Sequence, residues 1–452
     1  MRMESAHFIV YGENGEAKLR EAVRTLEMYD AELRHLLNAA PPERANKLEV
    51  YLLRNQPRLR QVWPNVTPDV LGFYSASPEE VAAFATYGEG AAIEAQQILF
   101  HEYAHHFMLQ TASLPYPSWY VEGFAEYVQT ITFERDRAVV GDFTQGRAHD
   151  ILSADWPPIE EFLKPDGARW SAEMHSRFYA ESWAATHYLM DDPTRMIHFR
   201  DYLHALMTGA DPVTAFQPAF GVSPADFERT LHGYARGAIP RMVAPLPTID
   251  VSHLQATPLS RATDDLLLLD ACLRRQVGAQ TIHDVGARAE EIAQHFPGDP
   301  FAQRVRARAL MLRGEYAQAR AILEALATAS PDDIDVQYLL GESYIVEAKA
   351  TTDAHARAAT ALQGRRYFTR AFHLNQDHVP TLFGYVETYL LGDAGFPDSA
   401  MDVLLRAYDL APQVSTIGVN AAANLMQRQH YDEAAAMLRP IAFAPHGRSA
   451  AA

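Results

Sequence analysis

The sequence has little cysteine and little basic charge. The first shortage excludes two kinds of cysteine site, and the second argues against two classes of binding protein. The single cysteine, Cys272, rules out an internal disulfide and a cysteine-rich metal site. The 39 basic residues are outnumbered by 57 acidic ones, which gives a formal net charge of −18. Proteins that bind nucleic acids or anionic membranes need basic surface, so the balance argues against both classes.

Long apolar runs are missing as well. No segment reaches the roughly 18 consecutive apolar residues that a membrane-spanning helix needs. The opening stretch, "MRMESAHFIVYGENGE", has no apolar run of signal-peptide length. We therefore expect a chain without a membrane span, and the opening stretch leaves its compartment open.

What is present is the composition of a globular protein. The chain of 452 residues is 48% hydrophobic and 21% charged, which suffices for two or three domains. Strand-like segments, rich in β-branched and aromatic residues or alternating in period two, occur at 6–12, 47–53 and 81–88. A long helical pattern covers 16–37. Together they predict a small α/β layer over residues 1–90.

From Ala91 onwards the pattern becomes helical. A wide apolar stripe covers 91–110, and Ser118 is a suitable N-cap for the helix that follows "LPYPS". Further helical patterns occupy 173–191, 196–207 and 224–236. Residues 238–260 carry four prolines and little periodicity, which predicts an interdomain linker with one short strand.

The last third of the chain is repetitive. The glycine, aromatic, small-residue and proline offsets of a tetratricopeptide repeat occur in 313–333, 396–412 and 429–445. Residues 338–350 predict the first helix of another unit, whose second helix resumes near Arg365 after roughly ten inserted residues. A degenerate unit is expected at 264–299. Small residues let the two helices of each hairpin approach closely, and each hairpin buries its apolar face against the next. A generic helical bundle is the alternative.

The stretch "FHEYAHHFMLQ" carries the strongest chemical signal. His101 and His105 are four residues apart, so a helix brings both onto one face, where they can bind one ion. Glu102 lies next to that face, where its carboxylate can take a proton from water. If 91–110 is helical, the pattern predicts half of a catalytic zinc site.

A catalytic zinc site also needs a third protein ligand and an open position for water. Glu122, in "SWYVEGFAEYVQ", supplies that ligand seventeen residues after His105. Glu126, one turn later on the same face, can accept a hydrogen bond from the free ring nitrogen of His101 and so fix its tautomer. We expect Zn²⁺ to be bound by His101, His105 and Glu122, and no other cofactor.

His101-Glu102-x-x-His105 followed by "WYVEGFAEY" resembles the gluzincin metallopeptidases, and most of all the peptidase MA-like proteins, some of which continue into tetratricopeptide repeats. The resemblance covers about 101–127 and implies a zinc peptidase with Glu102 as general base. It also implies that Tyr179 hydrogen-bonds the oxyanion, with packing as the alternative role. The resemblance further implies that the strand at 81–87 lines the cleft and pairs with an extended substrate, with an ordinary core or edge strand as the alternative.

These observations define the expected fold and domain organisation. The fold class is α+β: a small α/β amino-terminal layer, a helical zincin-like catalytic domain and an all-α tetratricopeptide-like solenoid. The expected domains are a metallopeptidase domain at 1–245 (an α/β segment at 1–90 and a helical zinc-site segment at 91–237), a linker at 238–260, repeats at 261–446 and a disordered tail at 447–452.

The expected partners are a peptide or protein substrate and a protein bound by the repeats. One alternative function is a specialised or inactive zincin scaffold that serves as a protein-binding module. Another is a zinc hydrolase of a non-peptide amide, since an activated water attacks any amide. The resemblance and the lack of disulfides favour an exported or periplasmic bacterial protein over a cytoplasmic one.

Overall fold

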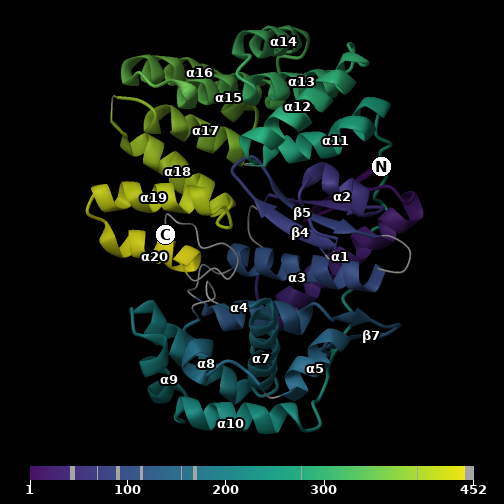
Figure 1. The fold of residues 1–452 in the computed structure, drawn as a ribbon, viewed down its shortest axis with the longest axis vertical. Helices are drawn as coiled ribbons and strands as arrows, with labels where there is room; N and C mark the ends of the chain where they lie inside the picture. The colour runs from purple at the N-terminus through teal and green to yellow at the C-terminus, as the bar shows by residue number, and fades with distance from the viewer. Residues whose placement is uncertain are drawn as a thin grey trace. The chain divides into compact units, whose positions relative to one another are not determined.

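The computed structural model describes residues 1–40, 46–68, 70–87, 92–111, 116–153, 155–165, 170–275, 277–393 and 395–442. These residues are mostly helical and include two small sheets (Figure 1). They form two compact units. The described residues within Met1–Val23, Glu43–Ala92 and Val251–Gln429 make up the first, and those within Arg24–Pro42, Ile93–Asp250 and His430–Ala452 the second.

The predicted domain limits, 1–245 and 261–446, stay a prediction. Helix α1 (Glu16–Leu37), which the pattern at 16–37 predicts, contributes residues to both compact units. The predicted tail at 447–452 lies outside the described residues.

The first unit contains a five-stranded sheet with the order β1-β2-β3-β5-β4. The strands are β1 (Arg2–Glu4), β2 (Phe8–Gly12), β3 (Leu48–Leu53), β4 (Gly72–Ala76) and β5 (Val81–Thr86). Strands β2, β3 and β5 are parallel, and β1 and β4 run antiparallel to their neighbours. The three strands that the sequence predicts are β2, β3 and β5. The pattern misses β1 and β4 because "RME" is short and "GFYSA" has no clear alternation.

Strand β5 lies in the interior of this sheet. Ala83 pairs with Val50 of β3 on one side and with Tyr74 of β4 on the other. The expectation that 81–87 pairs with an extended substrate is therefore wrong, because a strand with a partner on each side has no free edge. Within the described residues, the edge strand next to β5 is β4.

Helix α11 (Arg261–Arg274) packs onto the sheet. Its Leu267 and Ala271 share an apolar cluster with Tyr51 of β3 and Phe84 of β5. These side chains are all nearly inaccessible to solvent. The helix that opens the repetitive region of the chain therefore shares a hydrophobic core with the amino-terminal sheet.

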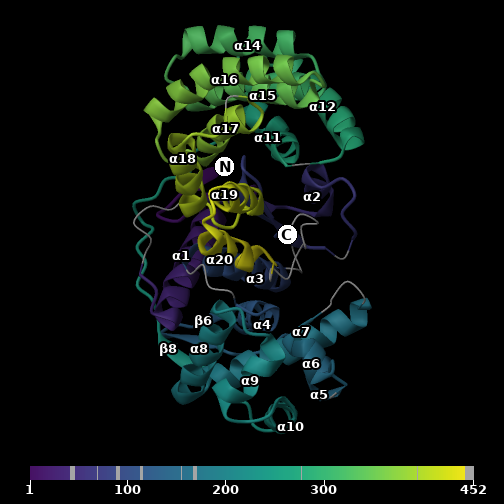
Figure 2. The same ribbon diagram turned by 90° about the vertical axis from the view of Figure 1, so that its left-hand side faces the viewer.

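The helices that follow α11 in this unit form stacked antiparallel pairs (Figure 2). They are α12 (Ala279–Gln294), α13 (Pro300–Leu312), α14 (Tyr316–Ala329), α15 (Ile334–Ala350), α16 (Ala354–Leu374), α17 (Val379–Leu390), α18 (Asp398–Leu410) and α19 (Ser415–Gln427). Small residues stand where helices approach closely: a Cβ on Gly341 would lie only 2.7 Å from Cε1 of Phe368. The helical hairpins predicted from the repeat offsets are present, including the degenerate one at 264–299.

The hairpin of α15 and α16 differs from the prediction. Its helices have 17 and 21 residues. Asp353 caps α16 by accepting a hydrogen bond from the backbone N–H of Ala356 at 2.7 Å, so the helix begins well before Arg365. The predicted restart near Arg365 is therefore wrong, because the inserted residues lengthen both helices instead of forming a loop.

The second unit is centred on α3 (Ala92–Thr111), α4 (Ser118–Val128) and α7 (Ala172–Met190). Helices α4 and α7 approach closely at Gly123, where a Cβ would overlap the backbone carbonyl of Ser182 and the hydroxyl of Thr186. The prediction of Ser118 as N-cap is wrong by one position, since the N-cap of α4 is Pro117.

Further helices and a three-stranded sheet complete the second unit. They are β6 (Thr132–Phe133), β7 (Arg137–Val140), α5 (Gln145–Ser153), α6 (Ile159–Leu163), α8 (Pro193–Met207), α9 (Pro212–Phe220), α10 (Pro224–Ala235), β8 (Met242–Pro245) and α20 (Tyr431–Ala442). Helices α8, α9 and α10 each begin with an Asp or Ser N-cap followed by proline, which explains their sharp starts. Strand β8 is the short strand predicted within 238–260, and it pairs with β7.

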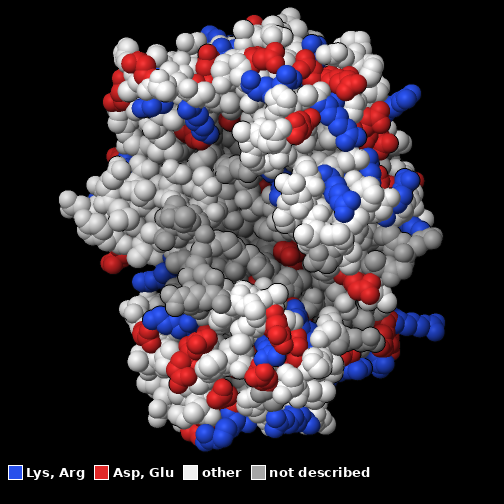
Figure 3. Space-filling model, in the orientation of Figure 1, with Lys and Arg blue, Asp and Glu red and all other residues white. Residues whose placement is uncertain are grey.

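Charged side chains of both signs are intermingled on the face of the protein shown in Figure 3. Ion pairs join neighbouring helices of the repeats, such as Arg304 Nη1 to Asp333 Oδ2 at 2.7 Å. Among the described helices, none combines the length and apolar character needed to cross a membrane.

Candidate metal centre

Helix α3 presents two imidazole rings one turn apart. The Nε2 atoms of His101 and His105 are 3.1 Å from each other, and the rings are nearly perpendicular at 85°. Two ring nitrogens at this distance either share one proton or direct two lone pairs at one cation. The geometry that the four-residue spacing predicts is therefore present on the helix.

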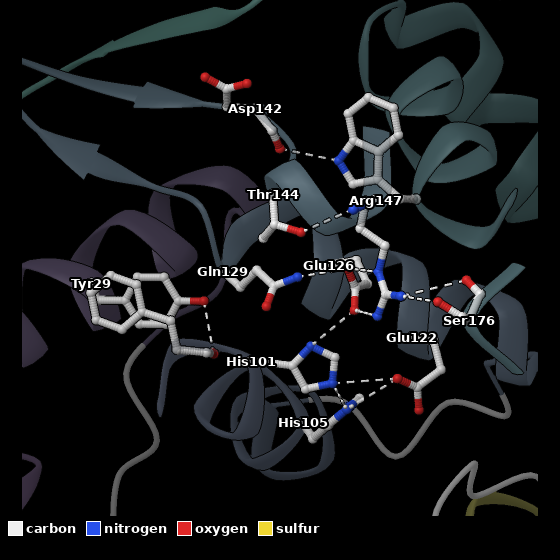
Figure 4. Close-up of polar contacts among 12 residues, drawn as sticks. Tyr29, His101, His105, Glu122, Glu126, Gln129, Asp142, Thr144, Arg147 and Ser176 are labelled. Carbon is white, nitrogen blue, oxygen red and sulfur yellow. Dashed lines mark hydrogen bonds and ion pairs between the residues drawn. The ribbon is translucent and has the colours of Figure 1, made fainter. Parts of the chain in front are cut away.

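Helix α4 adds a carboxylate to this pair. Oε2 of Glu122 lies 3.4 Å from Nε2 of His101 and 3.6 Å from Nε2 of His105 (Figure 4). The side chain of Glu122 has no exposed surface, and that of His101 is only 13% exposed. Burial of Trp119 and Phe124 on the same helix fixes α4 in the core and thereby positions Glu122.

The three side chains fit a zinc ion. In a tetrahedral site with bonds of about 2.0–2.1 Å, neighbouring ligand atoms are separated by about 3.3 Å. The separations of 3.1, 3.4 and 3.6 Å lie close to this value. Two histidines and one glutamate are also a ligand set of catalytic zinc sites, which keep a fourth position for water.

The electrostatic environment of the site favours positive charge. Burial by itself lowers the pKa of His101, but the hydrogen bond and charge of Glu122 and the charges of Glu126 and Glu102 outweigh it. The net effect raises the pKa of His101 above its ordinary value of 6.5. A cation is therefore stabilised at the position where the three ligand atoms converge.

Glu126 lies one turn after Glu122 and faces the back of the site. Its Oε1 is 3.8 Å from Nδ1 of His101, the ring nitrogen that points away from Glu122. Arg147 binds both oxygens of Glu126, with Nε to Oε2 at 2.9 Å and Nη2 to Oε1 at 2.8 Å. Gln129 donates a further hydrogen bond to Oε2 at 2.6 Å. The carboxylate of Glu126 is thus fixed beside the ring of His101.

Sequence reasoning missed Arg147. It lies on α5, 21 residues from Glu126, within "FTQGRAHDIL", which matches no motif. Its Nη1 also donates to Oγ of Ser176 at 2.9 Å, and its guanidinium lies 5.2 Å from the ring centroid of Tyr179. Arg147 therefore connects α4, α5 and α7 behind the three ligands (Figure 4).

Tyr179 and Glu102 belong to the same electrostatic environment. Burial raises the pKa of Tyr179, and the charges of Glu122, Glu126 and Glu102 raise it further, so the phenol keeps its proton. Glu102 is half-buried on α3, and its charge acts on both His101 and Tyr179. The predicted general base and the predicted oxyanion donor thus lie near the three ligand side chains, and their roles stay predictions.

Two other buried histidines of this unit are packing residues. His106 is 2% exposed, stacks on Tyr103 with ring centroids 5.6 Å apart, and burial lowers its pKa to about 4. His187 has its Nδ1 2.8 Å from the hydroxyl of Tyr234. Neither ring belongs to the group of ligand atoms around Glu122.

Residues 282–342 match the family model of the tetratricopeptide repeat. The chain contains a tetratricopeptide-repeat region. The match to this family begins within α12 and ends within α15. Such repeats point to protein–protein interaction.

Two further comparisons concern whole proteins. A solved structure of a thermophilic tetratricopeptide-repeat protein from Thermus thermophilus is similar, with 20% identity and a TM-score of 0.35. The likeness covers 41% of this chain and 92% of that chain. The search of curated proteins found no match.

Proposed function

We propose that the protein is a zinc-dependent peptidase in which His101, His105 and Glu122 bind the metal. The observation that carries the proposal is the convergence of two imidazole nitrogens and one carboxylate oxygen, all within 3.6 Å of one another, from two buried helices. A zinc ion held by these residues would supply a Lewis acid that polarises a carbonyl and acidifies water towards a pKa of about 7.

Glu102 is the general base in this proposal. It directly follows His101 on α3 and is only half-buried, so its carboxylate is accessible to a water molecule at the site. Glu102 takes the proton of the attacking water and passes it to the leaving nitrogen. The peptide bond then separates into a carboxylate and an amine.

Tyr179 and the pair of Arg147 and Glu126 support this reaction in different ways. The protonated phenol of Tyr179 donates a hydrogen bond to the oxyanion of the tetrahedral intermediate, which typically contributes about 3 kcal/mol. Arg147 and Glu126 touch no substrate. They hold the ring of His101 in its orientation, as carboxylates behind a ligand histidine commonly do.

The tetratricopeptide-repeat region has a recruiting role in this proposal. Stacked helical hairpins together form an extended surface that can bind another protein. We therefore propose that the repeats bind either the protein substrate or a partner that delivers it, and that residues 1–245 carry the peptidase site.

The test compares cleavage of a quenched peptide library by wild-type protein and by Glu102→Gln. We expect Glu102→Gln to lower the rate by about 10²–10⁴-fold, because it cannot accept the proton, while its zinc content stays that of the wild type. The matched control is Glu94→Gln, the same chemical change at an exposed position of the same helix, which should cleave like the wild type.

Two outcomes would contradict the proposal. Cleavage that survives in Glu102→Gln would mean that another group, or a contaminating peptidase, performs the reaction. Zinc-loaded wild-type protein that cleaves no peptide would instead favour the scaffold or the non-peptide amide hydrolase.

A further inference from the structure

A cavity in the first compact unit is lined by three arginines. It has a volume of about 470 Å³ and lies among α2 (Gln56–Val62), α11 and α12. The polar lining residues are Arg58, Gln61, Arg261, Asp265, Arg288 and His295. Two apolar side chains, Ile292 and Phe296, complete the wall. None of these residues belongs to the candidate zinc site, so the cavity needs its own explanation.

Two of the three guanidinium groups have no carboxylate partner among the residues that the structure describes. Within the described residues, Arg261 and Arg288 form neither an ion pair nor a side-chain hydrogen bond, and Asp265 does not neutralise them. Arg58 differs, because it binds Glu13 at 2.7 Å. Arg261 and Arg288 are both exposed, and the one carboxylate in the described lining, Asp265, forms no ion pair with either of them.

The donors around the cavity indicate the class of ligand. One guanidinium, with five N–H donors, already satisfies both oxygens of a carboxylate in a bidentate pair. A tetrahedral phosphate offers more oxygens and up to two negative charges, and so can use several guanidinium groups at once. Helix α11 begins at Arg261, and its N-terminal partial positive charge adds to the attraction.

We propose that this cavity binds a phosphate group, with Arg261 and Arg288 as its main ligands. The cavity is larger than a phosphate ion, and its apolar wall suits the organic portion of a small phosphate ester. Gln61 and His295 supply further hydrogen-bond donors. The carboxylate of Asp265 repels anions, so only a ligand whose attraction to the arginines exceeds this repulsion binds.

Titration calorimetry on the full chain tests the proposal with two probes, inorganic phosphate and phenyl phosphate, at constant ionic strength. We expect saturable binding at one site per chain, and tighter binding of phenyl phosphate because its ring contacts the apolar wall. The double variant Arg261→Ala/Arg288→Ala should bind each probe at least about tenfold more weakly than the wild type, since two charge-assisted contacts are lost. The double variant Arg261→Lys/Arg288→Lys should bind both probes with an affinity between those of the wild type and the alanine double variant, because lysine keeps the charge but lacks the bidentate fork.

The control removes the same charge elsewhere. Arg135→Ala/Arg357→Ala takes away two arginines that also form no ion pair among the described residues, and it should bind both probes like the wild type. A peptide carrying phosphoserine, compared with its unphosphorylated form, distinguishes a phosphorylated protein from a small phosphate ester as the source. Absence of saturable binding, or equal affinities of the wild type and Arg261→Ala/Arg288→Ala, would overturn the assignment.

Discussion

Arg147 holds Glu126 through both carboxylate oxygens, at 2.9 and 2.8 Å, and thereby fixes the side chain that lies behind His101. Both partners are largely buried, with exposed side-chain fractions of 20% and 4%. A bidentate pair of this kind restricts the carboxylate in direction as well as in distance. Arg147 therefore positions a proposed zinc ligand from a different helix without belonging to the ligand set.

Replacing Arg147 should weaken zinc binding. In Arg147→Ala the carboxylate of Glu126 keeps, among the described hydrogen bonds, only that from Gln129 and can turn away from His101, so we expect the zinc dissociation constant to rise about 10–100-fold. Arg147→Lys should lose less zinc affinity than Arg147→Ala, because lysine keeps the charge but not the bidentate contact. Competition with a chelating dye measures the constants. Arg137→Ala, which removes an exposed pair with Glu134, is the control and should leave zinc affinity unchanged. Equal zinc affinities in the wild type and the three variants would show that Arg147 is not needed to position Glu126.

Tyr179→Phe separates catalysis from packing. The variant keeps the ring that lies against Arg147 and removes only the hydroxyl. If the hydroxyl stabilises the oxyanion, kcat should fall about 10²–10³-fold with zinc content and KM nearly unchanged. Steady-state cleavage kinetics provide the measurement. A variant with wild-type kcat would reduce Tyr179 to a packing residue, the alternative that its sequence context leaves open.

Gly123→Ala should separate the two helices that position Glu122. The new Cβ would overlap the carbonyl of Ser182 and the hydroxyl of Thr186, so α4 and α7 must move apart. We expect a loss of about 1–3 kcal/mol in the free energy of unfolding, as for other overpacked cores, and weaker zinc binding.

The matched control for Gly123→Ala is Gly233→Ala on α10. No atom lies within 4 Å of the added Cβ there, and the higher helix propensity of alanine should stabilise the protein by up to about 1 kcal/mol. Urea unfolding compares the two variants. A destabilisation of equal size in both would mean that the close contact between α4 and α7 tolerates a methyl group.

Glu80 should make stability fall as the pH rises. Burial raises its pKa from 4.5 to about 8, although Arg274 lies 2.9 Å away and counteracts some of the effect. Between these two values the folded protein retains a proton that the unfolded chain has released, so folding becomes less favourable with increasing pH. The glutamine in Glu80→Gln cannot ionise, so this variant does not lose stability for this reason as the pH rises.

The stability advantage of Glu80→Gln over the wild type should therefore grow between about pH 5 and about pH 8. Urea unfolding at several pH values measures the difference. Glu94→Gln, at an exposed position, should show a difference that does not depend on pH. A constant difference for Glu80→Gln as well would mean that Arg274 keeps Glu80 ionised in the folded protein.

Local patterns in the sequence predict the elements that carry the site. The four-residue spacing of His101 and His105 and the helical context of Glu122 depend only on neighbouring residues, and the structure brings their ligand atoms within 3.6 Å. Repeat offsets likewise predict the helical hairpins, because the close packing of small residues recurs at fixed positions.

Long-range contacts could not be predicted in this way. Arg147 reaches Glu126 from 21 residues away in a segment without periodicity, and only tertiary packing reveals it. The edge strand β4 shows no clear alternation, so the sequence does not indicate that β5 is paired on both sides. The insertion before Arg365 looked like a loop because its composition does not show that two helices lengthen together.

Zinc binding by His101, His105 and Glu122 is tested most directly by the zinc content of the purified protein, measured by plasma mass spectrometry after dialysis against metal-free buffer. We expect one zinc ion per chain in the wild type and in Glu94→Ala, and a sharp loss in Glu122→Ala, in which one of three protein ligands is missing. Wild-type protein that retains no zinc, or Glu122→Ala that retains as much as the wild type, would contradict this assignment.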